Sequence, residues 1–213
     1  KFAQVDTLSD LYKLSMPKYQ PRPTVPLLVN LENKAYRIIA NESDEIAQLL
    51  NSSFESKNNS SLLIKESPEI LKNLINTNIN DGVYKCGFAR NQKSYLNAIN
   101  DLFDGLEYLE KGFKEHKGPW ICGEELTIAD IYLFPTLIRW ELIYSKLFKC
   151  TKKDLQEFPN IIDWRIRFFN LPGISETCSE NVWTNDYFKA LFPLNPNQIV
   201  PIQPSLNEIL SKK

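Results

Sequence analysis

The stretch LTIADIYLFPTLIRWELIYSKLF, residues 126–148, is apolar on almost every side. A helix that is hydrophobic all round lies in the interior of a domain, so this stretch predicts a central buried helix. Thr127 and Asp130 have the spacing of a capping box, which satisfies the first backbone N–H groups, and Pro135 should kink the helix. We expect four of its side chains in the core: Ile131, Phe134, Leu137 and Ile138.

The segments on both sides of this helix are also helical in pattern. Apolar residues between Tyr95 and Phe113 recur at steps of three and four, which predicts a helix with one buried face. The stretch FPNIIDWRIRFFNLPGI predicts another helix, which ends before Pro172. Residues 194–204, LNPNQIVPIQP, hold too many prolines for either regular element and predict an extended strap across the helices.

The N-terminal part of the chain has a different pattern. The stretch DTLSDLYKLS, residues 6–15, predicts a short helix. TVPLLVNLENKAYRIIANES, residues 24–43, predicts a hairpin with strands at about 24–30 and 35–40, followed by a helix that begins near Asn41. We expect one face of that helix to carry Ile46, Leu49 and Leu50.

The fold class that follows is α+β to mostly α, with a small α/β part before an all-helical domain. We expect the α/β part over residues 1–54 and a polar linker over 55–66, where ESKNNSS is low in complexity. The helical domain should span 67–193, and the strap 194–213. The chain begins at Lys1 without a methionine, which we interpret as a removed presequence or a fragment.

Composition argues against several functional classes. Hydrophobic residues make up 43% and charged residues 24%, and the net charge of −1 gives no reason to expect nucleic acid as a partner. No apolar run approaches the roughly 20 residues that span a bilayer. The four cysteines show no C-x-x-C spacing, and His116 is the one histidine, so we expect no metal site and no Ser-His-Asp relay. Reduced thiols predict an intracellular protein, with cytoplasm, mitochondrion and plastid all open.

The opening of the 24–43 stretch suggests a ligand site. Pro26 cannot donate to a strand ladder, so it belongs at the first residue of a strand or on an edge. The helix that begins near Asn41 offers unpaired backbone N–H groups, which favour an anion. A plain hairpin followed by a capped helix, with no ligand, would give the same sequence pattern. With the edge proline, the pattern favours a backbone built to hold a small molecule.

Several blocks of the sequence resemble one family in order. They are LYKLSMPKYQPRPTVPLL, NESDEI, NDGVYKCGFA, ADIYLFPTLIRW, LPGISET and LNPNQIVPIQP, and they extend from about residue 10 to 204. These blocks resemble glutathionyl-hydroquinone reductases, the Xi-class, omega-like glutathione transferases. The resemblance implies a truncated thioredoxin-like domain, a linker and the helical glutathione transferase domain.

The resemblance also implies roles for particular residues. Val25 would pair its backbone with the cysteinyl part of glutathione, with a cis Val25–Pro26 bond, and Glu42 and Ser43 would hold the γ-glutamyl end. Glutathione would be a co-substrate or a vestigial ligand. Tyr84 and Tyr187 match tyrosines that position the quinol substrate, whereas we interpret Tyr144, at the position of another family tyrosine, as structural.

The sequence also departs from the family. The nucleophilic cysteine of a Cys-Pro-Trp-like turn has no counterpart, and Cys86 and Cys150 match ordinary cysteines of the helical domain, so no catalytic residue is assigned. The family's His-Tyr-Tyr-x-Ser-His region reads DYFKAL, in which Phe188 replaces the second tyrosine. Leu147 and Leu74 replace a histidine and a tryptophan. Relaxed catalytic constraint and lineage drift in a working enzyme both fit these changes.

Three functions remain open from the sequence. The first is a non-catalytic structural or accessory subunit of a larger assembly, which we favour. The second is a glutathione-dependent thiol transferase that reduces glutathionyl-hydroquinones, with its nucleophilic cysteine in a segment outside these 213 residues. The third is a binding module that keeps the glutathione site without turnover. The strand at 24–30 should be covered by a further segment or a protein partner, and a homodimer is a further option.

Overall fold

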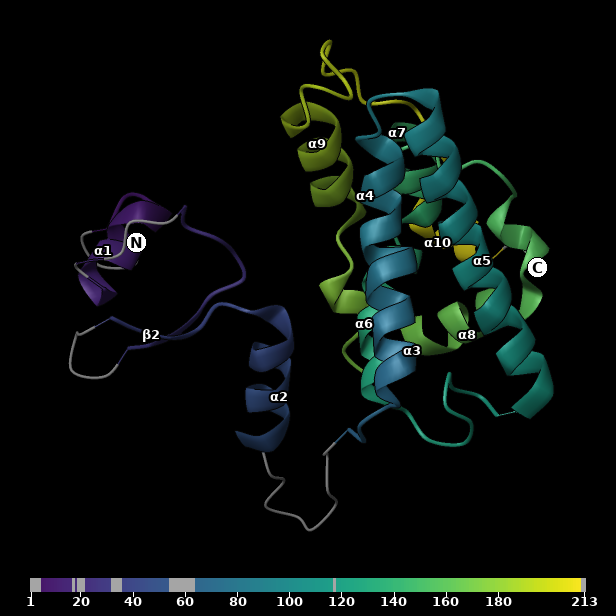
Figure 1. Ribbon diagram of the computed structural model, residues 1–213, viewed down its shortest axis with the longest axis horizontal. Coiled ribbons are helices and arrows are strands. Elements are labelled where there is room, and N and C mark those ends of the chain that lie inside the picture. The colour runs from purple at the N-terminus through teal and green to yellow at the C-terminus, as the bar shows by residue number, and fades with distance from the viewer. Residues whose placement is uncertain are drawn as a thin grey trace. The chain divides into compact units, whose positions relative to one another are not determined.

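The computed structural model describes residues 5–16, 18, 22–31, 36–53, 64–116 and 118–211. The chain divides into two compact units, Lys1–Ile64 and Lys65–Lys213. Figure 1 shows a few short elements in the first unit and a bundle of helices in the second. Each unit is described by itself. No helix among the described residues is long and apolar enough to cross a membrane.

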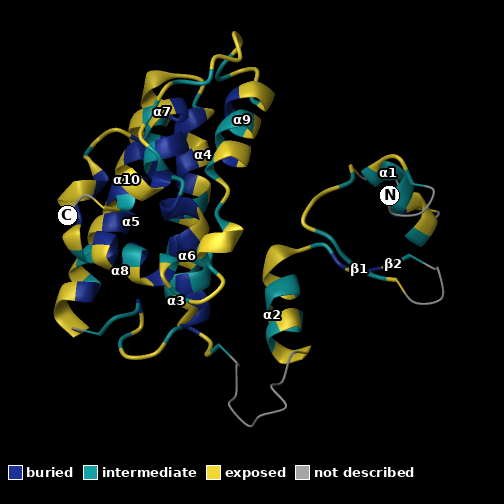
Figure 2. Cartoon of the chain, turned by 180° about the vertical axis from the view of Figure 1, so that it is seen from behind, coloured by how far each residue is buried: buried dark blue, intermediate teal, exposed yellow. Residues whose placement is uncertain are grey.

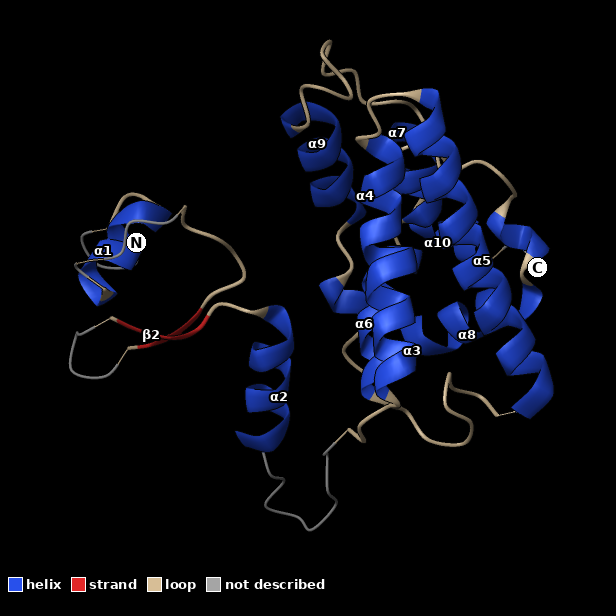
Figure 3. Ribbon diagram, viewed as in Figure 1, coloured by secondary structure: helices blue, strands red, loops and turns tan. Residues whose placement is uncertain are grey.

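The first unit combines two helices with a two-stranded sheet. Its elements are α1 (Leu8–Ser15), β1 (Leu28–Asn30), β2 (Arg37–Ala40) and α2 (Ser43–Ser53). The strands, red in Figure 3, pair antiparallel with Leu28 opposite Ala40, and an irregularity lies between Leu28 and Val29. Tyr12, Ile38 and Ala40 are the buried hydrophobic residues of the described part of this unit.

One expectation for this unit needs correction. The first strand covers Leu28–Asn30 rather than 24–30, because Pro26 has no N–H for a ladder and the chain before Leu28 follows another path. Ile46, Leu49 and Leu50 have the spacing of one face of α2, where Ile46 and Leu49 are half-buried and Leu50 is 42% exposed. Residues 55–63 of the expected linker lie outside the described residues.

The second unit is all helical. Figure 1 shows α4 and α5 running side by side, and in Figure 2 the buried residues gather where the helices face one another. A six-residue π-helical stretch joins α3 to α4, and short 3₁₀ turns precede α8 and α9. The helices are α3 (Glu69–Leu74), η2 (Ile75–Asn80, π), α4 (Asp81–Gly87), α5 (Gln92–His116), α6 (Ile128–Leu137), η3 (Trp140–Tyr144, π), α7 (Ser145–Leu147), α8 (Pro159–Phe169), α9 (Glu180–Ala190) and α10 (Leu206–Leu210).

The stretch 126–148 lies at the centre of this unit but is not one kinked helix. It forms α6, then the π-helical η3 and the short α7. Pro135 has no N–H to offer the carbonyl of Ile131, and α6 ends at Leu137. Phe134, Leu137 and Ile138 are buried as expected, and the Phe134 ring stacks on Phe168 at 4.3 Å between centroids. The expectation that Ile131 is buried is wrong: it is half-buried, because it packs against the core without being enclosed by it.

The capping box that the sequence predicts is present, and it does more than cap. Asp130 is fully buried, and its Oδ2 accepts hydrogen bonds from Thr127 N at 2.9 Å and Thr127 Oγ1 at 3.0 Å. Its Oδ1 accepts from Ile121 N at 3.0 Å and from the indole Nε1 of Trp164 at 2.8 Å. One carboxylate therefore joins the start of α6, the preceding loop and α8.

The segment after α9 runs without helix or strand until α10. Asn195 Nδ2 donates to the carbonyls of Phe188, at 2.6 Å, and Ile199, at 2.9 Å, which holds the turn at its start. At its far end, Leu206 N donates to Glu180 Oε2 at 2.5 Å. Side-chain and backbone hydrogen bonds therefore fix both ends of this segment to α9.

We expect Asp130→Asn to destabilise the protein by about 2–5 kcal/mol, because one amide oxygen cannot accept all four buried donors and the amide N–H₂ faces donors. Urea unfolding followed by circular dichroism measures the loss. Asp163→Asn is the matched control, since Asp163 is exposed on α8. Equal unfolding midpoints for the two variants would show that the Asp130 carboxylate does not organise this unit.

Candidate functional site

The first half of the expected glutathione site is a bare stretch of backbone before β1. The Val25–Pro26 peptide is cis, as expected, and the Val25 residue is 73% exposed. No hydrogen bond between described residues uses the N–H or the C=O of Val25. As far as the described residues go, both groups are therefore open to a ligand that lies alongside as an extended peptide.

The second half is the start of α2. Glu42 and Ser43 are exposed there, and Asp44 and Glu45 add two more carboxylates to the first turn. A helix start attracts an anion, whereas three neighbouring carboxylates repel one and attract a cation. A group that carries a carboxylate and an ammonium together satisfies both, and an amino acid head group of the γ-glutamyl kind has that pair of charges.

In the second unit, the tyrosines that the sequence singles out meet at one point. The hydroxyls of Tyr84, from α4, and Tyr187, from α9, lie 2.8 Å apart. Tyr144, from η3, adds its hydroxyl at 3.2 Å from that of Tyr187. Tyr84 is 40% exposed, Tyr187 half-buried and Tyr144 only 3% exposed. Tyr144 thus contacts the cluster from its buried side, which fits a structural role.

A fourth ring, which sequence reasoning missed, forms the floor of this tyrosine cluster. Phe148 is buried, with its ring centroid 5.2 Å from that of Tyr84, 5.3 Å from Tyr144 and 6.0 Å from Tyr187. It can approach α4 so closely because residue 87 is glycine: a Cβ there would overlap the Phe148 ring. Nothing in the local sequence distinguishes Phe148 from an ordinary core residue.

Burial raises the pKa of two of these phenols. Burial, reinforced by the hydrogen bond with Tyr187, raises the pKa of Tyr84 to about 12. Burial also raises the pKa of Tyr144, with the neighbouring tyrosines adding to the effect. The Tyr84 and Tyr144 hydroxyls are therefore neutral at neutral pH, and a neutral phenol can donate a hydrogen bond to a ligand oxygen.

None of the four cysteines is placed as a nucleophile. Cys86 and Cys150 are 1% and 0% exposed, and the Cys150 thiol points at the carbonyls of Val83, at 4.0 Å, and Phe148, at 3.9 Å. The neighbouring Cys150 thiol lowers the pKa of Cys86, and the Cys86 thiol together with burial raises the pKa of Cys150. Burial of the sulfur raises the pKa of Cys122 and of Cys178. A reactive thiol needs access and a stabilised thiolate together, and no cysteine here combines them.

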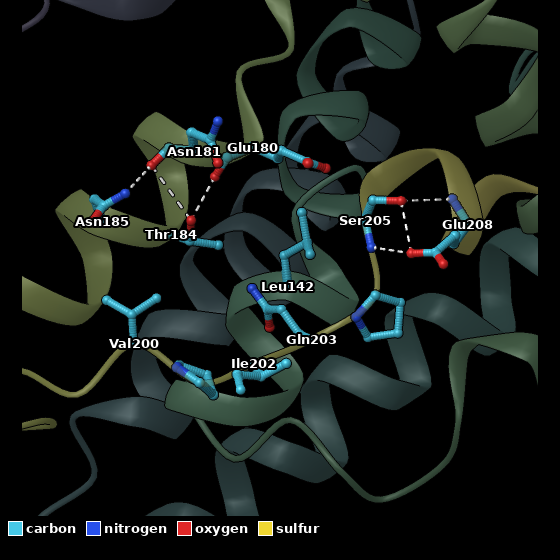
Figure 4. Close-up of a pocket in the computed structure, with 12 residues that line it drawn as sticks. Leu142, Glu180, Asn181, Thr184, Asn185, Val200, Ile202, Gln203, Ser205 and Glu208 are labelled. Carbon is cyan, nitrogen blue, oxygen red and sulfur yellow. Dashed lines mark hydrogen bonds between the residues drawn. The ribbon is translucent and has the colours of Figure 1, made fainter.

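A cavity of about 400 Å³ lies elsewhere in the second unit, between α9, the strap and α10. Figure 4 shows its polar rim, formed by residues such as Glu180, Thr184 and Glu208, with Leu142 at its base. None of the residues that the sequence predicted for the site lines it. In the described part of the chain, no group of three His, Cys, Asp or Glu side chains could hold a metal ion.

Comparisons with known proteins agree with this architecture. The family model for "Glutathione S-transferase, C-terminal domain" matches residues 89–167. A glutathionyl-hydroquinone reductase of Escherichia coli is 32% identical over 206 residues, 94% of this chain and 62% of its own length. One from Sphingobium chlorophenolicum is 33% identical over 205 residues, 94% of this chain and 64% of its own. The chain therefore spans less than two thirds of the length of these two relatives.

Solved structures give the same result. The glutathione-bound structure of a glutathione transferase homologue from Escherichia coli aligns with a TM-score of 0.85 and 32% identity over 96% of this chain and 68% of its own. The glutathione transferase Xi from Phanerochaete chrysosporium aligns with a TM-score of 0.84 and 31% identity over 95% and 70%. The chain belongs to the glutathione transferase family, in the Xi-class, omega-like group that includes the glutathionyl-hydroquinone reductases.

Proposed function

We propose that residues 1–213 bind glutathione without catalysing thiol transfer, and serve as an accessory part of a larger assembly. The observation that carries this proposal is the contrast between a bare ligand-pairing backbone at Val25 and four cysteines that are poorly placed as nucleophiles. A relative of 32% identity, aligned over 96% of this chain, has a structure described as glutathione-bound, which supports the choice of ligand.

Glutathione suits the two halves chemically. Its cysteinyl residue carries one N–H and one C=O, which pair with the C=O and N–H of Val25 as an added strand would. Its γ-glutamyl end carries a carboxylate for Ser43 and the first turn of α2, and an ammonium for Glu42. Pro26, next to Val25, sets the direction in which the chain leaves the site.

We expect Ser43→Ala to weaken glutathione binding about 10- to 150-fold, the effect of losing one hydrogen bond to a charged group. Isothermal titration calorimetry measures the dissociation constant, and hydrogen exchange should show protection of the Val25 and Ser43 amides by millimolar glutathione. Ser53→Ala, at the other end of α2 and also exposed, is the matched control. Unchanged exchange at both amides would show that the chain keeps the family's sequence pattern here but does not bind glutathione.

The tyrosine cluster suggests an aromatic second ligand. Tyr84 and Tyr187 are the two members with exposed surface, and we propose that their hydroxyls donate to the oxygens of a quinol-type molecule. Leu147 stands where the family has a histidine, and Phe188 stands where it has a second tyrosine. Both replacements remove a polar group from the same region. Binding of such a ligand without turnover is consistent with these replacements.

We expect residues 1–213 alone to show no glutathione-dependent reduction of glutathionyl-hydroquinones, because no accessible thiol here has a stabilised thiolate. Chromatographic loss of the conjugate in the presence of glutathione measures the rate. Cys122→Ser is the informative variant, since Cys122 is the cysteine residue classed as exposed. Turnover that this substitution abolishes would contradict the proposal and assign the chemistry to Cys122.

The second candidate function is the thiol transferase itself, with its nucleophilic cysteine in a segment outside these residues. Two relatives named glutathionyl-hydroquinone reductases, of which the chain spans 62% and 64%, favour this candidate. The full coding sequence distinguishes the two: a Cys-Pro-x-x turn joined in frame ahead of these residues supports the enzyme.

The sheet of the first unit suggests where a further segment or partner binds. Among the described residues, β1 pairs with β2 alone, so one side of a strand that contains Leu28 and Val29 has no strand beside it there. Unpaired strand edges invite pairing with other chains. We propose that this edge is covered by another segment, a partner protein or a second copy of the chain.

We expect residues 1–213, expressed alone, to self-associate as concentration rises, and Val29→Lys to reduce that association because a charge on an edge strand opposes pairing. Light scattering coupled to size-exclusion chromatography measures the mass. Ile202→Lys, at a fully exposed isoleucine of the second unit, is the matched control. A monomer at every concentration, or equal effects of both substitutions, would contradict a role for this edge.

A further inference from the structure

Tyr12 is a buried tyrosine whose hydroxyl reaches two distant parts of the first unit. It lies in α1, is 1% exposed, and donates from its hydroxyl to the carbonyl of Thr24 at 3.1 Å. The hydroxyl of Thr24 lies 3.3 Å away, and Asn41 Nδ2 donates to the Tyr12 oxygen at 3.4 Å. A phenol has one donor and two lone pairs, so it can serve all three partners.

The two residues that Tyr12 holds have one property in common. Thr24 directly precedes Val25, and Asn41 directly precedes Glu42 and Ser43. One oxygen atom thus contacts the chain immediately before each half of the proposed glutathione site. A tripeptide that binds both halves requires a fixed spacing between them, and this hydroxyl is a direct physical link across that spacing.

The contact with Thr24 also controls the direction of a ligand-binding group. The Thr24 carbonyl and the Val25 N–H belong to one planar peptide unit, and only the Val25–Pro26 bond is cis among the described residues. In a trans peptide the C=O and the N–H point in opposite directions. Because the Thr24 carbonyl points at the buried Tyr12 hydroxyl, the Val25 N–H is directed away from Tyr12.

The neighbouring hydrogen bond of α1 has no such connection and therefore serves as a control. Ser15, one turn further along α1, accepts a hydrogen bond on its Oγ from the N–H of Ile38 at 2.6 Å. This bond joins α1 to Ile38 of β2, which is not adjacent in the chain to Val25, Glu42 or Ser43. Tyr12 and Ser15 thus connect the same helix to the same unit, but only Tyr12 contacts residues next to the proposed site.

We infer that Tyr12 is a positioning residue of the glutathione site, whose hydroxyl sets the spacing between the Val25 backbone and the start of α2 and aims the Val25 N–H at the ligand. The inference deepens the proposed function and rests on it. Tyr12 itself does not touch glutathione. Its effect passes through Thr24 and Asn41, which is why the substitution to phenylalanine, with the same ring, isolates it.

The test compares Tyr12→Phe with Ser15→Ala in titrations of the full 213-residue chain with glutathione. We expect Tyr12→Phe to raise the dissociation constant about 3- to 10-fold, the effect of one lost hydrogen bond, and Ser15→Ala to leave it unchanged. A double-mutant cycle adds a readout that general loss of stability would not give. Tyr12→Phe should be non-additive with Ser43→Ala, whereas Ser15→Ala should be additive with it.

Each outcome has a distinct meaning. If the unmodified chain binds no glutathione, the proposed function fails and the inference falls with it. If the unmodified chain binds glutathione and Tyr12→Phe binds equally well, or if Ser15→Ala weakens binding as much, the inference alone is overturned. Should Tyr12→Phe not fold, Asn41→Ala removes one partner of the same hydroxyl and leaves the buried ring. Unchanged affinity in that variant likewise overturns the inference.

Discussion

The helical unit depends on one buried carboxylate. Asp130 accepts four hydrogen bonds, from Thr127 twice, from Ile121 and from Trp164, and has no contact with solvent. A buried charge is tolerated only when its hydrogen-bonding capacity is satisfied, so the start of α6, the loop before it and α8 must all be in place together. Lys65 extends this arrangement, since its carbonyl accepts from Ile128 N at 3.0 Å at the point where the second unit begins.

Different interactions stabilise the interior of each of the two units. The second unit has a continuous apolar core around α6, so its geometry follows from packing. The described part of the first unit buries three hydrophobic residues, and hydrogen bonds from Tyr12 and Ser15 connect its elements. The geometry of a ligand site in such a unit depends on a few specific polar contacts. Losing one of them changes that geometry more than losing one contact of a large core would.

The parts of the fold that the sequence predicts are those with a local signal. The Thr127–Asp130 spacing and the helical repeat before Phe113 depend on neighbouring residues, and both are found. The π-helical turn after Leu137 and the half-burial of Ile131 depend on how the rest of the chain packs, so the pattern misses them. In the candidate site, Tyr84 and Tyr187 come from the family resemblance. Phe148 and Tyr12 have no signal, because their roles arise from contacts with residues far along the chain.

The fit between Gly87 and Phe148 has a consequence for how this sequence can change. Every amino acid other than glycine has a Cβ, so any missense change in codon 87 adds an atom where the Phe148 ring lies, and the ring that supports the three phenols has to move. Gly112, on α5, has open space at its Cβ position, and alanine there would favour the helix. Two glycines of one domain therefore differ in mutational tolerance, and codon 87 can drift only if the aromatic cluster changes with it.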